Sequence, residues 1–148
     1  MATLSVTMIV KNEEDVLARA LTCAKKFADE IIVADTGSTD KTVNIAKSFG
    51  AKVYTYEWTD DFSAARNFAF EKAACDYVMW LDADDAISSD NCQKIIALKP
   101  LLDKADIWYM KYATAFDKDG KPTFEYWRER VFRRTLGACW TDPVHRTF

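Results

Sequence analysis

The sequence predicts an α/β fold with a mostly parallel central sheet flanked by helices and a late antiparallel hairpin. Over residues 4–81, short apolar runs alternate with segments whose apolar residues recur at helical spacing. Beyond residue 86 this alternation gives way to two strand-like segments separated by a turn. Strands that alternate with helices pair in parallel through right-handed crossovers, whereas strands joined by a tight turn pair antiparallel.

The first strand and helix are expected within residues 4–27. Residues 4–10 are apolar and rich in β-branched side chains, as in a buried strand. A polar turn follows at residues 11–15, and its acidic side chains suit the positive end of a helix dipole. The helix is predicted from apolar residues at helical spacing: Val16, Leu17, Ala20, Leu21, Ala24 and Phe27.

Two further pairs of strand and helix follow. Residues 31–34 and 52–58 are expected to form the second and third strands. The loop at residues 35–40 holds side chains that can cap the next helix, and Gly50 is placed to end that helix. A third helix is expected to run to about residue 74 and to lead directly into the fourth strand.

The fourth strand ends in a cluster of carboxylates. Residues 77–81 lack polar alternation, which is typical of a strand buried on both faces. If the backbone stays extended, Asp82 and Asp84 project to the same side. Two carboxylates there are suited to a divalent cation, which offsets their repulsion. Acidic residues after a strand are also common in solvated turns and helix caps.

The first, second and fourth strands are expected to end at one edge of the sheet, where open α/β sheets bind ligands. Asn12, Asp35 and the Asp82/Asp84 pair would meet there. After these residues, a capped helix is expected at 88–98, with Pro100 marking its end. A strand at 107–115, a turn at 117–120 and an antiparallel return at 123–134 complete the predicted hairpin.

Composition narrows the class of function. The 148 residues suit one domain, and the net charge of −3 gives no basic field for nucleic acid. The four cysteines form no Cys-x-x-Cys pair, so they are expected to be reduced thiols rather than zinc ligands. No apolar run is long enough for a transmembrane segment, and no leader pattern begins the chain, which favours a cytoplasmic protein.

Nucleotide binding by a glycine-rich loop is excluded. Neither a Gly-x-x-x-x-Gly-Lys loop nor a Gly-x-Gly-x-x-Gly turn occurs among the four glycines. A nucleotide would have to be held in another way, and a metal that bridges two carboxylates to a diphosphate is the simplest one.

Four motifs then occur in order: SVTMIVKNEE at residues 5–14, DEIIVADTGSTD at 29–40, SAARN at 63–67 and LDADD at 81–85. Together they resemble the family 2 glycosyltransferases, in particular the bacterial branch with lipopolysaccharide core glucosyltransferases and relatives that carry helical repeats. The resemblance is firm over residues 4–86. It is looser beyond, through RVFRR at 130–134 and PVH at 143–145.

The resemblance implies a GT-A fold and an inverting transfer from a nucleotide-diphosphate sugar, such as a UDP-sugar, with Mn²⁺ or Mg²⁺ on the Asp-x-Asp motif. The acceptor would be a glycan, a lipid or a protein in cell-envelope polysaccharide biosynthesis, and a peripheral membrane association is compatible with it. Residues 1–86 would form the nucleotide-binding half of a single catalytic domain. Residues 87–148 would begin its acceptor half, which is expected to be incomplete.

Individual roles follow from the same resemblance. Asp84 would be the principal metal ligand, Asp82 would contact the metal or the ribose, and His145 would be the third protein ligand. Arg66 would face the base or the diphosphate, and Asn67 would brace that corner. The implied contacts to the nucleotide sugar are Val10, Asn12, Glu14, Asp35, Thr36, Arg66, Asn67 and Asp82.

The catalytic base is left open. An inverting transfer needs a group that deprotonates the acceptor hydroxyl, and the late candidates are Glu125, Glu129 and Asp142. Two departures from the family pattern bear on the site: Thr36 stands where many members have Asp, and Arg146 follows His145 where Glu is common.

Three other functions compete with glycosyl transfer. A non-catalytic or truncated nucleotide-sugar-binding module would carry the same donor motifs. A nucleotidyltransferase would need a glycine-rich loop after the first strand, which residues 11–14 do not provide. A phosphatase with an Asp-x-Asp nucleophile would carry that motif after its first strand, whereas here it follows the fourth.

Overall fold

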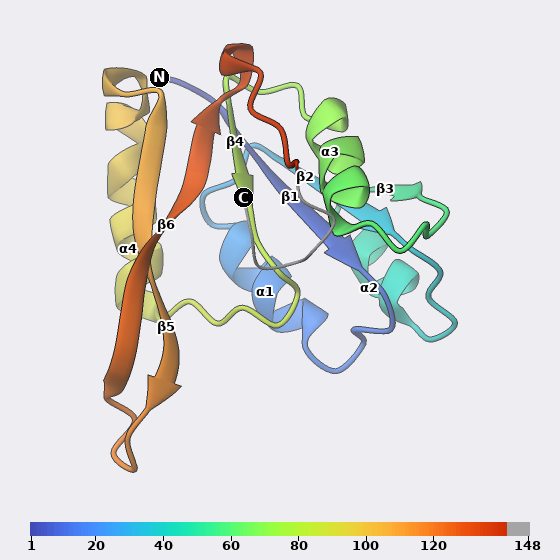
Figure 1. Cartoon of the computed structure of the whole chain (residues 1–148), viewed down its shortest axis with the longest axis horizontal. Coiled ribbons are helices and arrows are strands. Elements are labelled where there is room, and N and C mark those ends of the chain that lie inside the picture. The colour runs from blue at the N-terminus through green and yellow to red at the C-terminus, as the bar shows by residue number, and fades with distance from the viewer. Residues whose placement is uncertain (142–148) are drawn as a thin grey trace.

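The computed structural model describes residues 1–141, which form a single six-stranded sheet with helices packed against it (Figure 1). The elements in chain order are β1 (Leu4–Val10), α1 (Leu17–Ala24), β2 (Glu30–Asp35), α2 (Thr42–Ser48), β3 (Lys52–Thr55), α3 (Phe62–Lys72), β4 (Tyr77–Trp80), α4 (Ser89–Leu98), the 3-10 helix η1 (Lys99–Lys104), β5 (Ile107–Phe116), β6 (Pro122–Arg133) and the 3-10 helix η2 (Arg134–Leu136).

The strand order is β3-β2-β1-β4-β6-β5. β1 pairs in parallel with β2 and β4, and β2 pairs in parallel with β3. β6 pairs antiparallel with both β4 and β5. This arrangement confirms the predicted α/β class, with a parallel part built from alternating strands and helices and a late antiparallel hairpin.

The strands β1, β2 and β4 bury side chains on both faces, as their continuous apolar runs predict. On one face, alternate residues of β1, β2 and β4 pack with α1, α2 and α4 in the main core. On the other face, Ile32 and Ala34 of β2 pack with Ala69 and Phe68 of α3. Within β2 the split follows the two-residue period of a strand, since Ile31 and Val33 belong to the main core.

Local signals place the helix ends. The Asp61 side chain accepts a hydrogen bond from the Ala64 N–H at the start of α3, and Ser88 does the same for the Asn91 N–H at the start of α4. Gly50 follows α2 with φ 80°, in the left-handed region that glycine occupies most easily.

The predicted end of the third strand is wrong. This strand ends at Thr55 rather than at residue 58, because Thr55 pairs with Asp35, the last residue of β2, and the ladder has no partner beyond it. The helix predicted at residues 88–98 is confirmed, since α4 ends at Leu98, two residues before Pro100. Pro100 itself lies in the first turn of the 3-10 helix η1, where its missing N–H costs no hydrogen bond.

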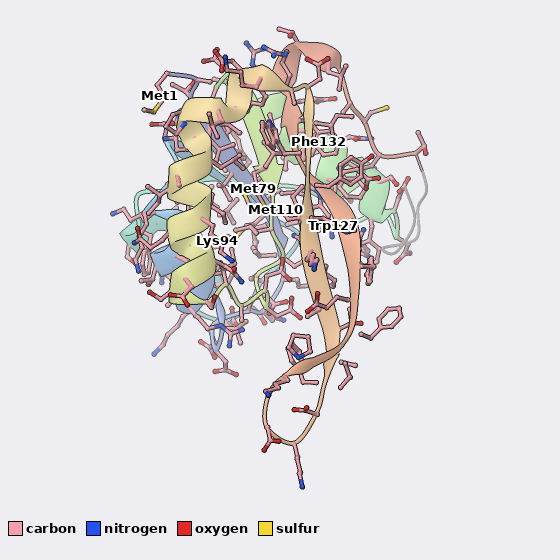
Figure 2. All side chains as sticks on the ribbon, turned by 90° about the vertical axis from the view of Figure 1, so that its left-hand side faces the viewer. Met1, Met79, Lys94, Met110, Trp127 and Phe132 are labelled. Atoms are coloured by element: carbon pink, nitrogen blue, oxygen red, sulfur yellow. The ribbon has the colours of Figure 1, made fainter. Side chains whose placement is uncertain are left out.

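The hairpin formed by β5 and β6 differs from the rest of the sheet. Its base pairs with β4 through Arg133, Phe132 and Val131. Figure 2 shows its distal part extending beyond the remainder of the molecule. Three large apolar side chains of the hairpin, Phe116, Phe124 and Trp127, are each more than half exposed. None of the helices in residues 1–141 has the length and apolar character that crossing a membrane requires.

Candidate active site

A cleft opens at the carboxyl ends of β1, β2 and β4, as the strand pattern predicts. β1 is flanked by β2 on one side and by β4 on the other, so the connections that leave these strands diverge at this point. The cleft has a volume of about 550 Å³. Its lining consists of Ile9, Val10, Lys11, Glu13, Thr36, Trp58, Phe62, Asp82, Ala83, Asp84 and Tyr112.

The carboxylates after β4 are brought together by a turn. The expectation of an extended backbone is wrong, because the Asp85 N–H donates to the Asp82 carbonyl (3.0 Å) and closes a tight turn over Ala83 and Asp84. Asp82, Asp84 and Asp85 each place a carboxylate oxygen within 4.8 Å of the others. Asp85 is a third member that strand alternation did not reveal, although its place in the Asp-Ala-Asp-Asp run was a signal for it.

Two buried arginines hold two of these carboxylates. Arg66 of α3 donates from Nη2 to Asp82 Oδ1 (2.8 Å), and Arg130 of β6 donates from Nη1 to Asp85 Oδ2 (3.0 Å). Asp84 is exposed, and among residues 1–141 no side chain pairs with its carboxylate. Asp84 is therefore the member of the turn most open to a cation.

Trp80, the last residue of β4, packs against both arginines. The Arg130 guanidinium lies 3.9 Å and the Arg66 guanidinium 5.0 Å from its ring centroid. Its indole N–H donates to the Glu129 carbonyl (2.7 Å), and its ring meets Trp140 edge-on at 5.2 Å. This tryptophan is core packing rather than a sugar platform, since it is 2% exposed.

Asp35 ends β2 and directly precedes Thr36, which lines the cleft. It is buried, and its Oδ2 accepts hydrogen bonds from the N–H groups of Gly37 (3.3 Å) and Ser38 (3.2 Å). Among the described residues no group donates to its other oxygen, Oδ1. Thr36 donates both its N–H and its hydroxyl to the Val10 carbonyl, at 2.9 and 3.0 Å, so this side chain joins β1 to β2.

Asn12 and Glu14 brace two loops against each other. Asn12 Oδ1 accepts from the Thr39 N–H (2.8 Å), and the backbone of Asn12 has φ 52°. Glu14 Oε2 accepts from the Lys41 N–H (3.2 Å). These contacts fix the loop that carries Asp35 and Thr36, and a role for either side chain in binding a nucleotide stays a prediction.

The negative charges of the acidic turn act on two nearby side chains, Glu13 and Tyr112. Burial, followed by the charges of Asp84, Asp40 and Asp82, raises the pKa of Glu13. Burial and the charges of Asp85 and Asp82 raise the pKa of Tyr112. Sequence analysis missed both residues; Glu13 stands between the two predicted residues Asn12 and Glu14, whereas Tyr112 carried no signal because the hairpin alone brings it here.

Asn67 ties the last described segment to α3. Its amide nitrogen donates to the Trp140 carbonyl (2.8 Å), and its oxygen accepts from the Trp140 N–H (2.7 Å). The Trp140 ring stacks on the Arg66 guanidinium at 4.9 Å, so residue 140 lies beside the acidic turn. The predicted residues Asp142 and His145 lie outside the described residues.

Of the two hairpin candidates for a catalytic base, Glu125 lies on the exposed part, whereas Glu129 is half-buried near the base of the hairpin. Glu125 Oε2 is 3.7 Å from Lys111 Nζ across the hairpin, and its side chain is 36% exposed. It is not among the residues that line the cleft. Glu129 contributes its carbonyl to the Trp80 contact. A catalytic role for Glu125 or Glu129 stays a prediction.

Comparison with known sequences identifies the family. The sequence profile of Glycosyl transferase family 2 matches residues 5–146. This chain belongs to glycosyl transferase family 2. Among relatives of this family 2 chain, a TPR repeat-containing protein of Synechococcus elongatus is 48% identical over 87 residues, which are 59% of this chain and 22% of that protein. An uncharacterized glycosyltransferase of Rickettsia typhi is 41% identical over 90 residues, or 61% of this chain and 30% of that protein.

Another relative is the SPbeta prophage-derived glycosyltransferase SunS of Bacillus subtilis, 38% identical over 103 residues, or 68% of this chain and 24% of that protein. The family 2 chain spans 22% to 31% of the length of such relatives. Among solved structures, TarS of S. aureus has a TM-score of 0.68 and 20% identity over 90% of this chain and 29% of its own.

Glucosyl-3-phosphoglycerate synthase of Mycobacterium tuberculosis, solved with Mn²⁺, UDP and glucosyl-3-phosphoglycerate, has a TM-score of 0.61 and 18% identity over 91% of this chain and 58% of its own. These structures are glycosyltransferases with the GT-A fold, and the likeness confirms that fold for the family 2 chain.

Proposed function

We propose that this chain is the donor-binding part of a metal-dependent, inverting glycosyltransferase that uses a UDP-sugar and a glycan, lipid or protein acceptor. The observation that carries the proposal is the turn of three carboxylates at the carboxyl end of β4, open to a cleft of about 550 Å³ in a family 2 chain. We assign residues 1–86 to the nucleotide and residues 87–148 to the start of the acceptor half.

The carboxylates fit Mn²⁺ or Mg²⁺, because both ions prefer oxygen ligands and three carboxylate oxygens converge here. Asp84 and Asp82 would hold the ion, with His145 as the third ligand. A bound ion would offset the charge that develops on the leaving diphosphate.

The nucleoside would lie against β1 and β2. Asp35 Oδ1 is a buried acceptor with no donor among the described residues, and such a group is satisfied by a ligand N–H. Uracil offers one at N3, which supports a uridine nucleotide. The Val10 carbonyl and Thr36 would border the base, and Arg66, braced beside Asn67, would add positive charge near the diphosphate.

Calorimetric titration tests the donor site. The chain is titrated with UDP, GDP, ADP and UDP-sugars, first with Mn²⁺ and then with excess chelator. We expect one uridine nucleotide to bind with Mn²⁺ and to bind weakly or not at all with chelator. Equal binding in chelator contradicts the metal site, and preference for a purine nucleotide contradicts the choice of uridine, since purines also offer N–H donors to Asp35.

A second function is a nucleotide-sugar-binding module without transfer chemistry of its own. The observation that favours it is that neither Glu125 nor Glu129, the described candidates for the catalytic base, lines the cleft. The two functions are distinguished by a chromatographic assay of the UDP released from a UDP-sugar in the presence of Mn²⁺. Hydrolysis or transfer supports the enzyme, and binding without turnover supports the module.

A further inference from the structure

We propose that Arg130 is a positioning residue for the metal site. It holds Asp85 as a brace, and this brace fixes the turn that presents Asp82 and Asp84 to the cleft. The inference rests on the proposed function. It assigns a role to the Arg130 and Asp85 pair, whose motifs RVFRR and LDADD gave neither residue a role of its own.

The contacts form a closed loop between two strands. Arg130 Nη1 donates both to the Trp80 carbonyl (3.1 Å), where β4 ends, and to Asp85 Oδ2 (3.0 Å), where the turn ends. The same Asp85 oxygen accepts from the Asp82 N–H (2.9 Å), where the turn begins. One guanidinium therefore connects both ends of the turn.

The pair is buried enough to be rigid. The Asp85 and Arg130 side chains are 9% and 6% exposed, and the Arg130 guanidinium lies between the rings of Trp80 (3.9 Å) and Tyr112 (4.9 Å). Removing one partner of a buried ion pair lowers the free energy of unfolding much more than removing one partner of an exposed pair. Asp85 Oδ2 is already engaged by two donors, which suits a brace rather than a metal ligand.

A brace and a purely electrostatic role for Arg130 predict opposite changes in cation affinity when Arg130 is removed. If Arg130 only added positive charge near three carboxylates, its loss would make the turn more negative and tighten cation binding. If Arg130 holds the turn in place, its loss separates the ligands and weakens cation binding. Outer partners of metal ligands typically change affinity by about 10- to 100-fold.

The electron paramagnetic resonance signal of free Mn²⁺ reports how tightly the chain binds Mn²⁺ in the absence of nucleotide. This measurement distinguishes the two accounts. We expect Arg130→Met and the charge-conserving Arg130→Lys each to weaken Mn²⁺ binding by about 10-fold or more. Lysine keeps the charge but cannot reproduce the planar fork that stacks between two rings. Circular dichroism and thermal unfolding report whether each variant is folded.

Arg133→Met is the matched control. Arg133 lies on the same strand and forms an ion pair with Asp106 (2.7 Å), but at the opposite end of β4 from the acidic turn. We expect its Mn²⁺ affinity to equal that of the parent. This control removes an arginine and an ion pair from β6 without touching the turn.

The outcomes distinguish failure of the proposed brace from failure of the proposed metal site. Tighter Mn²⁺ binding by Arg130→Met, or unchanged binding by Arg130→Lys, overturns the brace while leaving the metal site intact. Absence of Mn²⁺ binding by the parent overturns the proposed metal site and the brace with it. If Arg130→Met does not fold, Arg130→Lys alone decides.

Discussion

The parallel strands β1, β2 and β4 bury side chains on both faces, whereas the β5–β6 hairpin leaves most of its length in solvent. In the parallel part, loops are also tied to one another: Thr36 joins β2 to the end of β1, and Asn12 holds the following loop. The hairpin is tied down mainly at its base, through Arg130 and the Trp80 contact to Glu129. The difference indicates that the parallel part supplies stability and the proposed donor site, while the hairpin delivers side chains to its rim.

The largest expected contrast is in stability. Leu21→Ala in α1 removes a side chain that is fully buried in the main core, and we expect it to lower the free energy of unfolding by about 2–5 kcal/mol. Trp127→Ala removes a larger side chain that is 62% exposed on β6. We expect a change within about 0.5 kcal/mol. Urea unfolding measures both, and similar losses would show that the hairpin has a core of its own.

The next effect concerns the metal. Asp84→Ala is expected to abolish Mn²⁺-dependent donor binding, a loss greater than about 100-fold, because an inner ligand matters more than its outer partners. The thermal midpoint should hardly change, since Asp84 is exposed. Asp119→Ala, which removes an exposed carboxylate from the turn of the hairpin, is the control for donor binding. Parent-like binding by Asp84→Ala in calorimetry with Mn²⁺ would contradict the assignment.

A smaller effect is expected at the nucleoside. Asp35→Asn keeps the shape and one oxygen for the Gly37 and Ser38 N–H groups, but it turns the second oxygen into a donor. We expect uridine nucleotides to bind about 10- to 100-fold more weakly, with or without metal, because a hydrogen bond to a charged group is lost. Asp119→Asn, on the hairpin, should bind like the parent. Unchanged affinity in Asp35→Asn would place the base elsewhere.

The smallest effect concerns pH. The Thr3 N–H and hydroxyl donate to Asp76 Oδ2, at 3.0 and 3.2 Å, and lower the pKa of this carboxyl, which joins the starts of β1 and β4. A carboxyl whose pKa is lower in the folded state stabilises the fold at pH values above its unfolded-state pKa of about 3.9. This stabilisation is lost as the pH falls through its folded-state pKa. Asp76→Asn should thus be less stable than the parent at pH 7 and approach it below pH 4. Thermal midpoints across pH test this, and a constant difference would contradict it.

The parallel part was largely predictable from sequence because its signals are local. Continuous apolar runs marked β1, β2 and β4, and their polar ends correctly brought Asp35 and the Asp82 turn to one edge. The orientation of Asp82 and Asp84 was not predictable in this way, since a hydrogen-bonded turn rather than strand alternation sets it.

Other parts of the site depend on contacts between distant residues. Arg130 and Tyr112 reach the acidic turn only because β6 inserts between β4 and β5, and nothing in the sequence pattern specified that order. Asn67 was expected to brace its corner, but its partner, the backbone of Trp140, lies 73 residues away. Periodicity describes which face of an element is buried and says little about which distant element covers it.

The exposed distal hairpin has a consequence for how such a chain can diversify. Substitutions around Phe124 and Trp127 change a surface that contributes little to the core, whereas substitutions in β1 or β4 change the core and the donor site together. Sequence can therefore drift or be redesigned on the hairpin at little cost in folding free energy. New partners can be acquired there while the chemistry at the end of β4 is inherited unchanged.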